Sequence, residues 1–170
     1  ILFGGIDTEK FMGTLSSLKI YPDARSRGSE ITSFVVAFTS LSASSKSGTD
    51  TFTPTGFAQA ATLDSGTSLT LLPDDLAALV FQEVGASTDN DLGVVVPCAL
   101  SQVTGTLDFG FAGDNGPVIK VPISEMVLLL TDIHGNSPTY TNGRTVCSFG
   151  IEPAQGRPIL FGDTFLRSAY

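Results

Sequence analysis

The residues with the clearest capacity for chemistry form the segment Asp64-Ser65-Gly66-Thr67-Ser68, which lies between apolar runs. A carboxylate on a turn with hydrophobic flanks is partly desolvated, and desolvation perturbs its pKa. Gly66 lets the backbone of the turn approach a ligand closely, and the three hydroxyl groups can hold the carboxylate in one rotamer. The segment therefore suits a catalytic acid or base, although an ordinary polar turn before a helix would contain the same residue types.

The elements that must position this turn read as short strands. Apolar runs rich in Val, Ile and Phe alternate with Gly, Pro, Ser and Thr, which predicts an all-β protein with many turns. The Ser/Thr/Gly-rich stretch 40–55 is interpreted as a long solvated loop. We expect strands at residues 11–21, 31–38, 94–97, 106–111, 118–123, 128–131, 146–149 and 159–161.

One helix is expected shortly after the turn. Pro73 suits a first helical turn, and Asp74 and Asp75 complement the positive end of the helix dipole. Gly85 is a natural stop. The face that we expect to be buried comprises Leu76, Leu79, Val80 and Val84.

Composition limits the classes of function. Hydrophobic residues make up 42% and charged residues 15% of the 170 residues, so bulk disorder is excluded and one folded domain is expected. The net charge of -8, with nine scattered Lys and Arg, argues against a nucleic-acid partner. No apolar run reaches the length of a membrane span. The chain has no signal peptide and begins and ends in strand-like composition, so we interpret it as a piece of a longer protein.

The two cysteines, Cys98 and Cys147, are 49 positions apart and have no C-x-x-C spacing. With His134 as the single histidine they offer no zinc set, and we expect neither a metal nor a cofactor. Two buried thiols remain an alternative to one disulfide. A disulfide that closes a loop of this size would stabilise the fold by about 4 kcal/mol. We favour the disulfide, and with it a protein secreted into an oxidising compartment.

The turn at Asp64 resembles the D-[ST]-G-[ST] active-site loop of the pepsin-like aspartic protease family, and the resemblance runs along nearly the whole chain. The segment 159–163, Ile-Leu-Phe-Gly-Asp, is similar to the apolar-apolar-Gly signature that supports this loop. Cys98 and Cys147 fall where the C-terminal lobe of the family has its disulfide. Two further segments, 2–7 and 13–15, are similar to the family's strand near the interlobe region and the part that follows it.

The resemblance implies a pepsin-like acid protease lobe, built of antiparallel sheets with one or two short helices. It implies that residues 1–170 are the C-terminal lobe of a bilobal protein and that Asp64 is one of two catalytic aspartates. The N-terminal lobe would supply the second. The resemblance also implies that Thr67 bonds across to the matching loop of that lobe. The other implied site residues are Ser65, Gly66 and Ser68, which support the loop, and Thr62 and Leu160, which lie near substrate subsites.

The implied activity is peptide-bond hydrolysis by a water molecule activated between two carboxylates that share one proton, which favours acidic pH. The implied partners are the N-terminal lobe and a peptide or protein substrate. The implied location is extracellular, with the cell surface or a vacuole as variants. Ser65 and the Ser/Thr-rich stretch are most similar to fungal secreted or cell-wall members.

Three alternatives stay open. The protein could be a non-catalytic peptide-binding module whose other lobe lacks its aspartate. The chain could be an isolated lobe, which we expect to be inactive because it contains only one such loop. A homodimer that pairs two copies of Asp64 could rebuild a pair of carboxylates.

Overall fold

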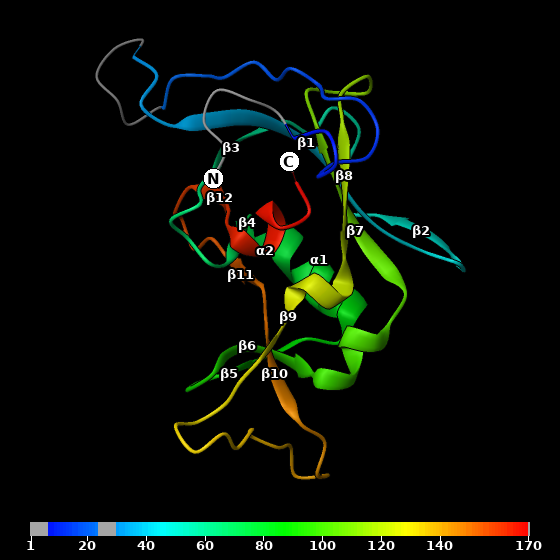
Figure 1. The fold of residues 1–170 in the computed structure, drawn as a ribbon, viewed down its shortest axis with the longest axis vertical. Helices are drawn as coiled ribbons and strands as arrows, with labels where there is room; N and C mark the ends of the chain where they lie inside the picture. Colours follow the sequence, from blue (N-terminus) through cyan, green and yellow to red (C-terminus); the bar gives the residue numbers. More distant parts are fainter. Residues whose placement is uncertain (1–6, 24–29, 170) are drawn as a thin grey trace.

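The computed structural model describes residues 7–23 and 30–169, and its fold is shown in Figure 1. Strands of these residues form an eight-stranded sheet and a four-stranded sheet. In Figure 1 the smaller sheet lies at the lower end of the view, with the two helices between it and strand β1. The segment 2–7, expected to resemble the interlobe strand, lies outside the described residues except for Asp7.

The larger sheet has the order β11-β4-β12-β3-β1-β7-β8, with β2 paired to β1. The smaller sheet has the order β5-β6-β10-β9. The strands of the larger sheet are β1 (Phe34–Ser45), β2 (Gly48–Thr51), β3 (Gln59–Leu63), β4 (Thr70–Leu72), β7 (Gly105–Phe111), β8 (Val118–Pro122), β11 (Ile151–Pro153) and β12 (Ile159–Phe161). The remaining elements are β5 (Ser87–Asp89), β6 (Gly93–Pro97), β9 (Val127–Leu129), β10 (Val146–Phe149), helices α1 (Asp74–Val84) and α2 (Asp163–Leu166), and the 3₁₀ turns η1 (Cys98–Gln102) and η2 (Ile123–Met126).

The predicted all-β class with short helices is confirmed, but the larger sheet is mixed. Most neighbouring strands run antiparallel, whereas β12 runs parallel to β3 and β11 runs parallel to β4. Parallel strands end at the same edge of a sheet. The residues that follow β3 and β12 therefore meet, although about a hundred positions of sequence separate the two strands.

The prediction of a solvated loop at residues 40–55 is wrong. Strand β1 continues to Ser45, and β2 pairs back on it from Ser42↔Thr51 to Ser45↔Gly48. Leu41 and Ala43 are buried at alternating positions, as one face of a strand requires. The outward positions of this hairpin carry Ser and Thr, which gave the stretch the composition of a loop.

The prediction of a strand at residues 11–21 is also wrong. These residues form no strand, and only an isolated bridge joins Tyr21 to Val35. The apolar residues do not share one buried face, because Leu15 is 42% exposed whereas Leu18 packs against the core. The loose alternation of apolar residues in this segment therefore did not indicate a strand, because these residues do not pair with a neighbouring strand along their length.

Helix α1 begins and ends as expected. Gly85 has the left-handed backbone (φ 69°) of a helix C-terminus, and its N–H donates to the carbonyl of Phe81. The buried residues are Leu76, Ala77 and Val80, whereas Leu79 is 42% exposed. The buried face is therefore rotated toward Ala77, and the inclusion of Leu79 in that face was wrong.

Phenylalanine rings pack in the core of the larger sheet. Phe161, at the end of β12, lies with its ring centroid 5.2 Å from that of Phe38, 5.5 Å from Phe109 and 4.6 Å from Phe165. All four side chains are fully or almost fully buried. Burial of one such ring stabilises the fold by about 1.5–3 kcal/mol, and ring contacts add to this. This packing fixes the end of β12 in place.

A buried carboxylate lies on the opposite face of the same sheet. Asp108 of β7 is only 6% exposed and accepts hydrogen bonds from Ser44 (2.9 Å), Thr106 (2.5 Å) and the Lys120 ammonium. Burial acts to raise the pKa of Asp108, but the hydrogen bonds and the positive charge outweigh it and lower the pKa below the ordinary value for aspartate. Asp108 is therefore an ionised structural residue.

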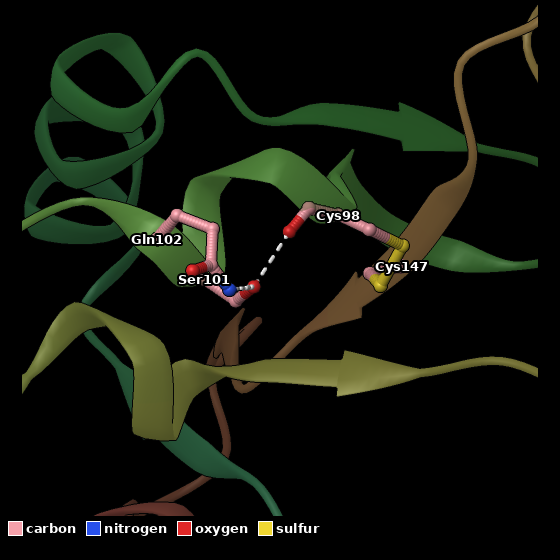
Figure 2. The surroundings of a disulfide bond; sticks show 4 residues. All are labelled: Cys98, Ser101, Gln102 and Cys147. Atoms are coloured by element: carbon pink, nitrogen blue, oxygen red, sulfur yellow. Dashed lines mark hydrogen bonds between the residues drawn. A yellow bond between two sulfur atoms is a disulfide. The ribbon is translucent and has the colours of Figure 1, made fainter.

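The predicted disulfide is confirmed. Cys98 and Cys147 are bonded, with their Cα atoms 5.0 Å apart. Figure 2 shows the bond between the start of η1 and β10, with the Ser101 hydroxyl donating to the Cys98 carbonyl (2.8 Å). The side-chain amide of Gln102 in turn donates to Ser101 (3.2 Å). The link thus ties the 3₁₀ turn after β6 to β10, one of the two inner strands of the smaller sheet.

Across residues 7–23 and 30–169, no helix is long and apolar enough to cross a membrane.

Candidate active site

Asp64 is the first residue after β3, and the end of β12 holds it in place. Its backbone N–H donates to the carbonyl of Phe161 at 3.0 Å. Strand β3 lies between β1 and β12, so the turn projects from the interior of the larger sheet rather than from its edge. The sequence-based expectation that Asp64 lies against the segment 159–163 agrees with this geometry.

The turn after Asp64 packs on the turn at Gly162 that leads from β12 into α2. Asp163 donates its N–H to the Thr67 carbonyl (2.8 Å), and Thr164 donates to the Ser68 carbonyl (3.1 Å). Gly162 makes this approach possible, because a Cβ atom there would lie 2.3 Å from the Thr67 carbonyl oxygen and 2.4 Å from that of Leu69. The glycine of the predicted signature is therefore required by contact with the backbone of the turn.

Two donors of the turn hold the Asp64 carboxylate. The N–H of Gly66 donates to Oδ1 (2.9 Å), and the Thr67 hydroxyl donates to Oδ2 (2.7 Å). The bond from Thr67, followed by that from Gly66, lowers the pKa of Asp64 below the ordinary value, against a smaller opposing effect of desolvation. The carboxylate is thus oriented and favoured in its ionised form.

Hydrogen bonds between buried threonine hydroxyls connect the two turns on their interior side. These contacts were not predicted from the sequence. Thr164 donates to the Gly150 carbonyl (2.9 Å) and lies 3.1 Å from the Thr70 hydroxyl. Since the Thr164 proton is used on Gly150, the Thr70 hydroxyl donates to Thr164. The sequence does contain a signal for this contact. Thr70 and Thr164 each lie beside an apolar segment, where a buried hydroxyl group needs a hydrogen-bond partner.

Asp64 lies on the wall of an open hollow of about 840 Å³. Ser65, Thr67 and Ser68 line it together with Asp64, and Leu63, Leu69 and Leu71 supply apolar surface. Thr62 and Leu160, the predicted subsite residues, lie opposite each other on β3 and β12 and line the same hollow. Gly66 is in contact with the carboxylate but is not on the wall.

The arrangement presents an oriented carboxylate to any ligand that enters the hollow. Apolar side chains combined with a few convergent polar groups are the usual lining of a ligand site. The individual roles assigned to the loop residues and to Thr62 and Leu160 stay predictions. So does a bond from Thr67 to a second lobe, because within this chain the Thr67 hydroxyl donates to Asp64. Among the described residues, no three His, Cys, Asp or Glu side chains gather as ligands for a metal ion.

Comparison with known proteins defines the family. The family described as "Eukaryotic aspartyl protease" matches residues 1–170. The chain is 37% identical over 172 residues to the "Probable aspartic-type endopeptidase opsB" of Aspergillus oryzae and 42% identical over 176 residues to the protein of the same description from Arthroderma otae. It is 32% identical over 199 residues to "Secreted aspartic protease 7" of Candida albicans. The chain therefore belongs to the eukaryotic aspartyl protease family.

The three relatives are longer than this chain. Each alignment covers 100% of the chain but only 33%, 35% and 31% of the respective relative. The aspartic proteinase from Irpex lacteus has a similar structure, with a TM-score of 0.67 and 19% sequence identity. That match covers 97% of this chain and 45% of the Irpex lacteus chain, and it confirms the pepsin-like fold.

Proposed function

We propose that this chain supplies one of the two catalytic aspartates, Asp64, of an aspartic-type endopeptidase. The observation that carries the proposal is the Asp64 carboxylate, fixed by Thr67 and Gly66 on the wall of a partly apolar hollow. Membership of the aspartyl protease family and the names of the relatives support the same reaction class.

Residues 1–170 are proposed to form the C-terminal lobe of a bilobal protein. Two facts support a second lobe: the match covers less than half of the Irpex lacteus chain, and the sequence contains one D-[ST]-G-[ST] loop. The second lobe would place its own aspartate opposite Asp64, at the exposed side of the hollow. A peptide or protein substrate would lie between the lobes.

The chemistry follows from two carboxylates that share one proton. The hydrogen bonds from Thr67 and Gly66 favour the ionised form of Asp64, so Asp64 accepts a proton from the attacking water. The hydroxide adds to the scissile carbonyl carbon while the protonated carboxyl of the other lobe donates to the carbonyl oxygen. Transfer of a proton from Asp64 to the amide nitrogen then breaks the C–N bond, and the new carboxyl product returns the shared proton.

An extracellular location is proposed on two grounds. The disulfide between Cys98 and Cys147 requires an oxidising compartment for its formation and persistence. One relative is named a secreted aspartic protease. The cell surface and a vacuole are compatible with the same two observations.

The test compares the full-length protein with its Asp64→Asn variant. Removal of a group that transfers protons in the reaction should lower kcat at least about a hundredfold, with little change in the urea midpoint. Asp50→Asn is the matched control, because it makes the same charge change at an exposed position of β2. Cleavage of an unstructured peptide mixture at acidic pH, read by mass spectrometry, gives the rates.

The other outcomes separate the alternatives. A protein that binds peptides but does not cleave them would be a non-catalytic binding module. Denaturing mass spectrometry of the natural source identifies any second polypeptide with its own aspartate loop. Activity that is unchanged in Asp64→Asn would refute the proposed role of Asp64.

A further inference from the structure

The floor of the hollow ends in two charged side chains. Residues directly opposite each other on neighbouring strands run from Thr62 on β3 to Leu160 on β12, then to Leu71 on β4 and Glu152 on β11. Arg157 lies beside Glu152, and both line the hollow with Asp64. The row thus begins near the candidate catalytic residue and ends at an ion pair.

The turn that carries Arg157 is held at several points. Ala154 donates its N–H to Leu72 (2.7 Å), and Gln155 donates its N–H to the Asp74 carboxylate (2.7 Å). The Arg157 side chain then donates from Nε to the Ala154 carbonyl (2.9 Å) and from Nη2 to Pro153 (3.2 Å). The guanidinium is therefore positioned before any ligand binds, although its side chain is 52% exposed.

The ion pair leaves capacity for a further carboxylate. The distance from Arg157 Nη2 to Glu152 Oε2 is 3.8 Å, which is longer than a hydrogen bond. Two carbonyl groups use two of the five N–H donors of a guanidinium. The planar arrangement of the remaining donors suits a carboxylate that binds through both oxygens.

The distance of Arg157 from the Asp64 end of the hollow determines which residue of a bound peptide it could contact. Neighbouring strands are about 4.8 Å apart, so the three steps from Thr62 to Glu152 span about 14 Å. An extended peptide advances about 3.4 Å per residue. A peptide that lies across these strands would therefore cover the span with about four residues. We infer that Arg157 binds an acidic side chain of the peptide about four residues from the scissile bond, and that the protein thereby selects peptides with a carboxylate there.

The inference rests on the proposed function, because the hollow must be the substrate cleft. It predicts opposite effects for the two members of the ion pair. Arg157→Gln removes the positive charge and should abolish the preference. Glu152→Gln removes the competing carboxylate and should strengthen it. This second variant also leaves the bonds from Arg157 to the backbone intact, so it tests the inference even if Arg157→Gln disturbs the turn.

The experiment uses the full-length protein and sets of peptides that differ by Glu, Gln or Lys at one position, scanned three to five residues on either side of the cleaved bond. At about pH 5.5, where a peptide carboxylate is ionised, we expect kcat/KM to favour Glu over Gln by about fivefold at one position. Added salt should reduce this ratio. Lys46→Gln, the same charge change on the turn between β1 and β2, should leave it unchanged.

Binding of the same peptides to the Asp64→Asn variant, measured by fluorescence anisotropy, distinguishes failure of the proposed function from failure of the inference about Arg157. Selective binding of the Glu peptide without cleavage by the wild type would refute the proposed function and retain only the binding of a peptide carboxylate by Arg157. Cleavage with equal rates for Glu and Gln, or with a preference for Lys, would overturn the inference and retain the function. A Glu preference that Arg157→Gln and Glu152→Gln leave unchanged would also overturn it.

Discussion

Replacement of Gly162 by alanine tests how the site is positioned. Gly162 lies where the chain after β12 crosses the turn that begins at Asp64. The added methyl group would lie 2.3 Å from the Thr67 carbonyl oxygen and 2.4 Å from the Leu69 carbonyl oxygen. Both contacts are with backbone atoms, so rotation of a side chain cannot relieve them, and the two turns must separate.

The size of the effect can be worked from the contacts that such a separation breaks. Overpacking alone destabilises proteins by about 1–3 kcal/mol. The bonds from Asp163 to Thr67 and from Thr164 to Ser68 would lengthen, and each contributes about 1 kcal/mol. We therefore expect Gly162→Ala to lower the free energy of unfolding by about 3–5 kcal/mol, a large part of the stability of a typical domain.

Urea unfolding and amide hydrogen exchange measure the two parts of this prediction. The exchange of the Asp64 amide, which donates to Phe161, should accelerate with the loss of stability. Gly85→Ala is a suitable control, because Gly85 has a left-handed backbone (φ +69°) and open space around its Cβ position. It should cost only about 1–2 kcal/mol through backbone strain. If Gly162→Ala is no more destabilising than Gly85→Ala, the steric account of the crossing is wrong.

Three further changes test features of the same structure. Thr67→Val removes the hydroxyl donor, so the pKa of Asp64 should rise toward its ordinary value, and NMR titration of the side-chain carboxyl would show this; an unchanged pKa would mean that the bond does not control it. Asp108→Asn should cost about 1–3 kcal/mol near neutral pH. The cost should shrink in acid, because the lowered pKa of Asp108 gives a stabilisation that is present above the unfolded value near pH 4 and is lost as the pH falls through the folded value. Urea unfolding at both pH values checks the trend, and a penalty independent of pH would argue against an ionised Asp108. Replacement of Cys98 and Cys147 together by serine should lower stability by about 4 kcal/mol, measured under the same non-reducing conditions as the parent; a loss below about 1 kcal/mol would contradict the chain-entropy estimate.

The sequence was sufficient for elements whose residues carry a strong local signal. Helix α1 was predicted because Pro73 and Gly85 mark its ends, and β6 and β10 because Val and Phe dominate them. The β1–β2 hairpin was missed because its outward residues are serine and threonine, which are typical of loops. Leu79 was placed on the wrong face because the buried stripe of α1 centres nearer Ala77.

The candidate site was predicted through resemblance rather than through local pattern. Asp64 and Gly162 are 98 positions apart, and composition or periodicity does not show that their turns meet. The parallel pairing of β3 with β12 is a property of the whole sheet, so it could not be derived from either strand alone. The Thr70–Thr164 contact and the charged end of the hollow at Arg157 depend on other long-range pairings, those of β4 with β12 and with β11.

The disulfide also determines what happens if the polypeptide is cut. The loop between β9 and β10 lies inside the ring that Cys98 and Cys147 close, and Ile133 in that loop is 95% exposed. Exposed loop tips are preferred sites of proteolysis. A nick at Ile133 would leave two pieces joined covalently, with β9 and β10 still paired in the smaller sheet. Such a molecule would migrate as one species until a reductant releases its fragments, so a clipped form could retain the architecture around Asp64.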